Sequence, residues 1–315
     1  MRKLIDASNE SLKNFGDGTS HFQHYFAETG LFSDDKLASL IERYPREYYM
    51  INTMTAQGDE PEWRSGEINN ISGEKVLQAL TDGRIWLALR RFDVVCPEYY
   101  QLVTQAFSEI EGLNPALNTF KHNPSMLISS PGARVLYHCD IPYVCLFHVR
   151  GRKKLWLYDA ENKMHLPDKT LEGIILRETE EEIHYDEAWD QTALEITLEP
   201  GFALSWQLNA PHRVDNLDGL NVSITTDYFT SFAQKKYGVY YTNGLMRRKL
   251  GMEPKSTSVD GIGAYAKCAA ALALKKTGIL KVDEREMVST FQLDPDNIGQ
   301  IIDIPEDQRN IIHQL

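Results

Sequence analysis

Two histidines and an aspartate have the residue types and the spacing of a metal site. His138 and Asp140 are separated by one residue, and His212 follows 72 residues after Asp140. Alternate residues of a β-strand point to the same face, so a strand through this segment sends His138 and Asp140 to one side. A later strand must then bring His212 beside them. On these three residues alone, the commoner explanation is a strand with one core histidine and one turn aspartate.

Two neutral imidazoles and one carboxylate occupy one face of an octahedral metal ion and leave three adjacent positions open. This ligand set is typical of non-haem Fe(II) oxygenases. A 2-oxo acid such as 2-oxoglutarate can chelate the iron through its carboxylate and keto oxygens, and O2 can take the remaining position. The metal supplies the difficult chemistry, while the protein orients the substrate and excludes water. The predicted reaction is a hydroxylation, with His138, Asp140 and His212 as metal ligands and catalytic residues.

Two longer segments surround these residues, HCDIPYVCLFHVRGRKKLWLYD at 138–159 and LEPGFALSWQLNAPHRVDNLDGLNVSITTDYF at 198–229. They resemble the JmjC or cupin-like Fe(II)/2-oxoglutarate hydroxylases. In that family the HxD motif begins one strand, a glycine turn precedes a basic residue, and a Pro-Gly turn leads to the distal histidine. All of these parts occur here in the same order. The resemblance covers about a third of the chain.

The resemblance also implies residues for 2-oxoglutarate. The family places a Lys or Arg thirteen residues after the aspartate, where it pairs with the far carboxylate of the cofactor, and Lys153 stands at that position. Alternation along the strand sends Lys153 to one face and its neighbours Arg152 and Lys154 to the other. On the last strand, Asn221 and Ser223 are further expected cofactor contacts.

Between about residue 119 and residue 232 the chain has the pattern of short β-strands. Val, Ile, Tyr and Leu are frequent, Pro-Gly and Asp/Asn turns interrupt them, and no helical pattern is long enough for a βαβ unit. The predicted fold class is mainly β, a double-stranded β-helix of the cupin or jelly-roll type with N-terminal and C-terminal helices. The predicted strands cover residues 125–128, 134–140, 143–149, 153–158, 194–198, 203–207, 212–216 and 221–229.

Helices are predicted on both sides of this core from apolar spacing and capping residues. They lie at 33–45, 72–80 and 97–113 before the core, with a strand at 84–92, and at 261–276 after it. The acidic connection at 160–193 is either a solvated insertion or a functional segment, as a lid or a substrate loop.

Three regions are predicted along the chain. Residues 1–118 form an N-terminal helical region with strands that extend the core, residues 119–232 form the metal domain, and residues 233–315 form a C-terminal helical region. The apolar segment 262–274 needs a cover, because one helix with a solvent-facing side does not require so many apolar residues. Since the resembling hydroxylases often dimerise through C-terminal helices, we expect a homodimer.

Composition restricts the expected partners and compartment. A net charge of −12 and a pI near 5.3 repel a phosphate backbone, and no Lys/Arg stripe offsets them, so nucleic acid is not an expected partner. The four cysteines form no CxxC pair, which fits a reducing compartment. The N-terminal residues lack the apolar run of a signal peptide, and no apolar segment is long enough for a bilayer. We expect a cytoplasmic protein without membrane contact.

Two other functions compete with the hydroxylase. One is a cupin that binds metal without oxygen chemistry, as an isomerase or ligand-binding module, and the other is a metal-free scaffold. The first has no need of a buried cation at Lys153, and the intact triad argues against the second. The substrate stays open between a protein or peptide side chain and a small molecule. Demethylation is less favoured than hydroxylation, because no reader domain or basic tail accompanies the core.

Overall fold

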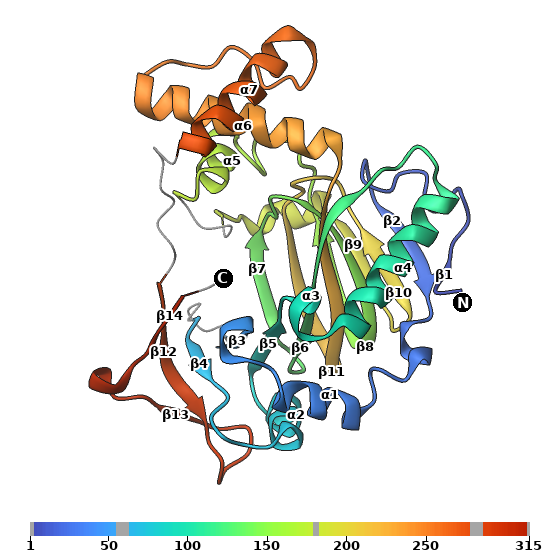
Figure 1. Ribbon diagram of the computed structural model, residues 1–315, viewed down its shortest axis with the longest axis vertical. Helices are drawn as coiled ribbons and strands as arrows, with labels where there is room; N and C mark the ends of the chain where they lie inside the picture. Colours follow the sequence, from blue (N-terminus) through green and yellow to red (C-terminus); the bar gives the residue numbers. More distant parts are fainter. Residues whose placement is uncertain (1–2, 55–62, 179–182, 278–285, 314–315) are drawn as a thin grey trace.

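Two curved β-sheets that share two long strands form the centre of the protein. We describe residues 3–54, 63–178, 183–277 and 286–313 of a computed structural model, shown in Figure 1. The shared strands, β8 (Tyr143–Leu157) and β11 (His212–Phe229), run antiparallel beside each other over nearly their whole length. Two sheets joined in this way form a double-stranded β-helix, so the predicted fold class is confirmed.

The other strands extend each sheet outward from the shared pair. The smaller sheet has the order β9 (Leu194–Leu198), β8, β11 and β7 (Arg134–His138). The larger sheet has the order β1 (Ile5–Asp6), β2 (Ser20–His24), β10 (Phe202–Ser205), β8, β11, β6 (Phe120–Ser129), β5 (Ile85–Leu89), β3 (Tyr49–Thr53), β4 (Ser65–Glu67), β12 (Glu286–Leu293) and β13 (Ile301–Asp303), and β14 (Ile311–His313) pairs with β12.

Each long strand bends where it passes from one sheet to the other. The pairing of β11 with β8 shifts register between Asn216 and Ser223. On β8, Gly151 has a left-handed φ of +76°, and a Cβ there would lie 2.7 Å from the side-chain nitrogen of Asn221. A glycine is therefore required at this bend. The sequence predicts two separate strands on either side of each bend, whereas the structure has one continuous bent strand in each place.

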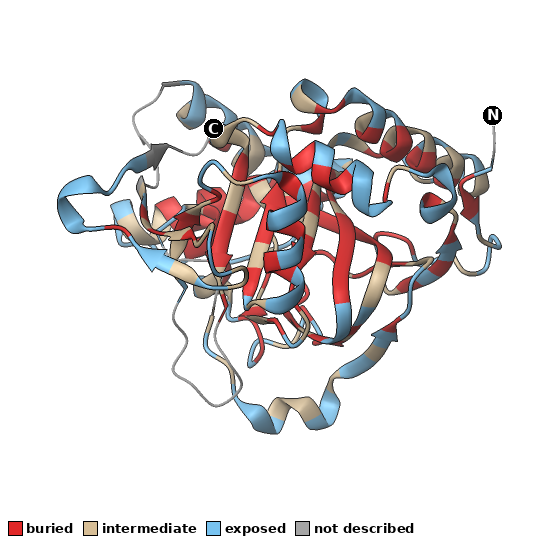
Figure 2. Cartoon of the chain, turned by 90° about the horizontal axis from the view of Figure 1, so that it is seen from below, coloured by how far each residue is buried: buried red, intermediate tan, exposed pale blue. Residues whose placement is uncertain are grey.

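Helices cover the outer face of the larger sheet. They are α1 (Asp34–Glu42), α2 (Gly73–Asp82), α3 (Phe92–Val95) and α4 (Pro97–Leu113), and all but the short α3 were predicted. Their apolar faces pack against the sheet and form the main core, the buried layer drawn red in Figure 2. Representative core residues are Leu37, Val76, Phe107, Ile128 and Ile224. The described residues also form short 3-10 helices at Phe26–Thr29, Arg46–Tyr48, Glu187–Thr192 and Glu306–Gln308.

Three further helices form a separate layer, at the top of Figure 1. They are α5 (Asp168–Ile175), α6 (Ser231–Leu250) and α7 (Gly261–Thr277). Leu171, Tyr240 and Leu245 belong to their shared core, which also includes Cys139, the residue between the first two predicted metal ligands. This layer therefore supports the HxD segment. In the described part of the chain, no helix combines the length and apolarity that a membrane span requires.

The last part of the C-terminal region is not helical, which corrects the prediction for residues 233–315. The helices end at Thr277, and the chain returns to the sheet as β12, β13 and β14. β12 pairs in parallel with β4, and Phe291 is fully buried against Gly66. The partner strand is very distant in sequence, since Arg64 bonds to Thr290, 226 residues later. A search for local periodicity cannot identify such a pairing.

Candidate metal centre

The three predicted metal ligands come together at one end of the smaller sheet. His138 is the last residue of β7 and His212 is the first residue of β11, and the antiparallel pairing places them opposite each other. Their ring centroids are 4.1 Å apart. Asp140 follows His138 by two residues, and its Oδ2 lies 3.4 Å from Nε2 of His212. One ligand atom from each of the three residues lies within 4.8 Å of the other two.

Hydrogen bonds to backbone carbonyls orient both imidazoles. Nδ1 of His138 lies 2.7 Å from the carbonyl oxygen of Leu136, and Nδ1 of His212 lies 3.0 Å from that of Ala210. A carbonyl oxygen only accepts, so each Nδ1 carries the proton and each Nε2 keeps its lone pair. Metal-binding histidines are commonly held in this way.

Burial makes this cluster electrostatically suited to a cation. It raises the pKa of Asp140, an effect that His138 opposes, and it lowers the pKa of His212 well below the usual value. The imidazole of His212 is therefore neutral. The carboxylate is costly to ionise in this place without a compensating positive charge. Two lone pairs and one buried carboxylate that face each other fit a divalent metal ion.

Lys153 is buried on β8. Its residue is 5% exposed, and within the described residues no hydrogen bond or ion pair satisfies its ammonium group. Burial lowers the pKa of Lys153 to about 8. Its neighbours lie on the opposite face, where Arg152 pairs with Asp218 and Lys154 pairs with Glu195. Lys153 is thus the cation of this segment that points away from solvent.

Asn221 and Ser223 form hydrogen bonds at the bend of the long strands. The amide nitrogen of Asn221 donates to the carbonyls of Asp218 and Gly219, and its Oδ1 is buried with no hydrogen-bond partner in the described part of the chain. Oγ of Ser223 lies 2.9 Å from Nδ1 of His148, whose Nε2 lies 2.8 Å from the carbonyl oxygen of Gly151. Since the carbonyl oxygen of Gly151 can only accept, His148 donates a hydrogen bond from Nε2 and accepts one from the Ser223 hydroxyl at Nδ1. The role of Asn221 and Ser223 as cofactor contacts stays a prediction.

The acidic connection at 160–193 is partly packed against the rest of the protein. Residues 179–182 lie outside the described residues, but both flanks are ordered in place. Asp190 accepts hydrogen bonds from Tyr158 at 2.5 Å and from Tyr185 at 2.6 Å, and Arg213 binds its other oxygen at 2.5 Å. Arg213 and Tyr158 alternate with His212 and Leu157 along their strands, so this contact lies on the outer face of the smaller sheet. Sequence analysis did not predict these contacts of Asp190, although Arg213 directly follows a predicted ligand.

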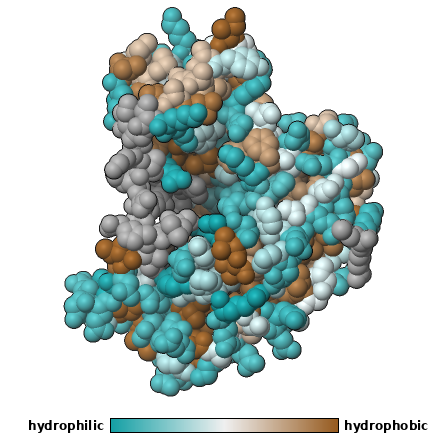
Figure 3. Space-filling model, viewed as in Figure 1, coloured by the Kyte–Doolittle hydropathy of each residue, from teal (hydrophilic) through white to brown (hydrophobic). Residues whose placement is uncertain are grey.

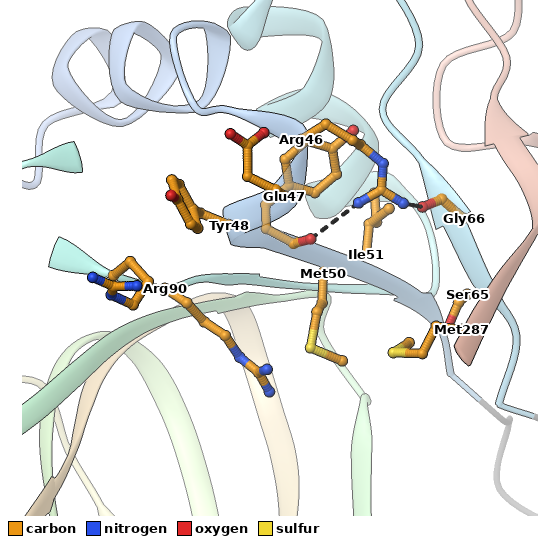
Figure 4. Close-up of a pocket in the computed structure, with 11 residues that line it drawn as sticks. Arg46, Glu47, Tyr48, Met50, Ile51, Ser65, Gly66, Arg90 and Met287 are labelled. Carbon is orange, nitrogen blue, oxygen red and sulfur yellow. Dashed lines mark hydrogen bonds between the residues drawn. The ribbon is translucent and has the colours of Figure 1, made fainter. Parts of the chain in front are cut away.

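A separate pocket, open to solvent, lies between β3, β4 and β12. Figure 4 shows Arg46 among the residues that line it. The guanidinium of Arg46 donates to the carbonyls of Tyr49 and Gly66 and to the hydroxyl of Ser289. No triad residue lines this pocket. Arg46 joins three strands, so structural support explains its presence beside the pocket.

Comparisons with known proteins support the fold. No protein-family model and no curated protein sequence matches this chain. A crystal structure of YcfD from Escherichia coli matches with a TM-score of 0.50 and 15% identity, over 87% of this chain and 69% of that one. Another structure of that protein, described as a ribosomal oxygenase, has a TM-score of 0.48 at 15% identity, over 87% and 67%. A third, in complex with cobalt and 2-oxoglutarate, has a TM-score of 0.48 at 14% identity, over 87% and 68%. At these identities the likeness establishes a shared fold.

Proposed function

We propose that this protein is an Fe(II)- and 2-oxoglutarate-dependent dioxygenase that hydroxylates its substrate. His138, Asp140 and His212 would hold the iron, and Lys153 would pair with the far carboxylate of 2-oxoglutarate. The observation that carries the proposal is the combination of two features in one barrel. One is a convergent set of two imidazoles and a carboxylate, and the other is a buried lysine that has no counter-charge among the described residues.

Each residue has a distinct task in this proposal. With iron and 2-oxoglutarate bound, the centre would couple the oxidation of 2-oxoglutarate by O2 to succinate and CO2 with the insertion of one oxygen atom into the substrate. Asp140 balances part of the charge of the ion, and the two neutral histidines supply their Nε2 lone pairs. Lys153 offsets the carboxylate that burial would otherwise penalise. The apolar wall of the barrel, which includes Leu155 and Val214, excludes water from this space.

The substrate class remains part of the proposal. YcfD, which shares the fold, is described as a ribosomal oxygenase, so a protein side chain is one choice, and a small molecule is the other. A net charge of −12 favours a basic peptide over an acidic one, and it does not favour nucleic acid. All four cysteines are free, as suits the reducing cytoplasm.

An anaerobic titration tests the cofactor assignment. We expect Fe(II) and 2-oxoglutarate together to give the visible charge-transfer band of the chelate, and O2 to convert 2-oxoglutarate to succinate. The alternative function, a metal-binding cupin without oxygenase activity, predicts iron binding without this band. A protein that binds Fe(II) but neither gives the band nor consumes 2-oxoglutarate would contradict the dioxygenase proposal and favour that alternative.

We further propose a homodimer that covers α7. Ile262, Tyr265 and Leu272 lie along one side of this helix and are 89%, 59% and 64% exposed. Figure 3 shows apolar surface on the helical layer at the top of the molecule. Exposed apolar side chains at this spacing are typical of a contact surface. Light scattering at micromolar concentrations should give twice the 36.0 kDa chain mass, and a monomer throughout would refute the dimer.

A further inference from the structure

Asn209 connects the two chain segments that carry the triad. It lies three residues before His212 and is 4% exposed. Its side-chain nitrogen donates to the carbonyl of Asp140 at 2.9 Å and to the carbonyl of Ile141 at 3.0 Å. Both acceptors are carbonyl oxygens, so the nitrogen of the amide, and not its oxygen, must face them. One buried amide thus uses both of its hydrogens on the HxD segment.

Asp140 depends on such a support more than the two histidines do. His138 and His212 lie within paired strands and are held opposite each other by the sheet. Asp140 lies after the end of β7, and β8 begins only at Tyr143. Strand pairing therefore does not fix the backbone from which the carboxylate extends. The two hydrogen bonds from Asn209 fix it relative to the turn that leads into His212.

The backbone conformation at Asn209 does not by itself require an amide side chain. Its φ is +61°, and it is the third residue of a turn closed by the N–H of Ala210 and the carbonyl of Gln207. Glycine and asparagine are the residues that suit this turn position. Glycine would satisfy the backbone equally well. What asparagine adds to the turn is its donor group.

We propose that Asn209 is a positioning residue of the metal centre, which holds the Asp140 carboxylate at the distance from His212 that a shared ion requires. The proposal rests on the proposed function only in that the triad binds a divalent metal. Sequence analysis did not single out Asn209, because its acceptors lie 69 and 68 residues away in the chain. The available signal was an asparagine in the turn before a predicted ligand.

Co(II) binding to the metal-free protein tests this role without measuring turnover. The Asn209→Gly variant keeps the turn conformation and removes the amide. We expect it to bind Co(II) roughly 10- to 100-fold more weakly than the wild type, as is usual for residues that orient metal ligands. The visible absorption of bound Co(II) should also change, because the carboxylate is no longer held in one place. Circular dichroism should show that the variant is folded.

Asn216→Ala is a matched control. Asn216 is a buried asparagine on β11 whose amide nitrogen also makes two hydrogen bonds, to Ser129 and Ser130 at 2.8 Å each, without contact to the triad. Its Co(II) affinity should equal that of the wild type. Equal weakening in both variants, or unchanged affinity and spectrum in Asn209→Gly, would overturn the proposal.

Asn209→Asp keeps the size of the side chain and tolerates the same backbone, but it presents oxygens to the two carbonyls. We expect weak Co(II) binding from this variant too, and wild-type affinity would overturn the proposal even if Asn209→Gly did not fold. A wild-type protein that does not bind Co(II) would refute the proposed metal site itself. That result is distinct from the failure of the Asn209 proposal, in which the wild type binds and the variants bind equally well.

Discussion

Two regions of this protein each bury a charged side chain, but they differ in whether the fold supplies a partner of opposite charge. Glu172 of α5 is fully buried, and Arg247 and Arg248 of α6 bind its carboxylate at 2.9 and 3.1 Å. Lys153 of β8 is 5% exposed and has no such partner within the described residues. The first charge joins two helices. The second costs free energy in the structure as it stands.

The contrast separates structural support from a binding site. A buried charge with two partners is satisfied by the fold and needs no ligand. A buried charge without a partner is retained at a cost, which an anionic ligand would remove. The pocket beside Arg46 has a structural explanation, since both terminal nitrogens of that guanidinium already bond to the fold.

The largest expected effect is that of Asp140→Ala. It removes the only anionic ligand of the proposed centre, so iron affinity and 2-oxoglutarate turnover should fall by more than about 100-fold, beyond the loss typical of groups that only orient ligands. The fold should persist, because no core packing is lost. Calorimetric titration with metal and a succinate assay measure the two effects. Normal turnover by the variant would contradict the triad.

Glu172→Gln should act on stability and not on the cofactor. It leaves two arginines without their buried counter-charge, which we expect to lower the free energy of unfolding by about 3 to 5 kcal/mol. Chemical denaturation measures this change. The folded variant should bind 2-oxoglutarate as the wild type does. A loss of cofactor affinity without a loss of stability would reverse the roles assigned to the two regions.

Lys153→Met should do the opposite. Removing the cation should weaken 2-oxoglutarate binding by about 2 to 5 kcal/mol, while stability should be unchanged or higher, because an uncompensated buried charge disappears. Arg152→Ala is the control, since Arg152 is exposed and pairs with Asp218. Titration of the charge-transfer band compares the variants. If Arg152→Ala weakened binding more than Lys153→Met, the assignment of the buried cation would be wrong.

The smallest expected effect is a pH dependence of cofactor affinity. Burial lowers the pKa of Lys153 to about 8, so the ammonium form, which pairs with a carboxylate, predominates below pH 8 and is lost above it. The dissociation constant of 2-oxoglutarate should therefore rise above pH 8, approaching about tenfold per pH unit. Binding measured at constant ionic strength between pH 7 and pH 9.5 tests this. Lys153→Met should lack this pH dependence, and a wild-type profile in that variant would assign it to another group.

Local sequence patterns predicted the parts of the fold that depend on nearby residues. The burial of Leu37, Leu40 and Ile41 follows from helical spacing in α1. Strand alternation predicts His138 and Asp140 on one side, although β7 ends at His138 and Asp140 extends from the turn that follows. The opposite faces of Lys153 and Arg152 follow from the same rule. These are consequences of backbone geometry over a few residues.

Features that depend on distant partners were not predictable in this way. β12 is a strand because β4 offers it an edge, and the bend at Gly151 joins segments that look like separate strands. Helix α5 lies in an acid-rich connection, so the sequence suggests that Glu172 is solvated. In the structure Arg247 and Arg248 of α6 bind its carboxylate. In each case the deciding contact is far away in the sequence.

The pairing of β12 with β4 has a consequence for the order of folding. During synthesis, Ser65–Glu67 emerges long before Glu286–Leu293, so the edge of β4 that pairs with β12 stays uncovered until that later segment has been made. Closing a contact over so long a stretch of chain is slow, and an uncovered strand edge is a template for pairing with other chains. Nascent chains and fragments that lack β12 therefore expose an edge that promotes aggregation.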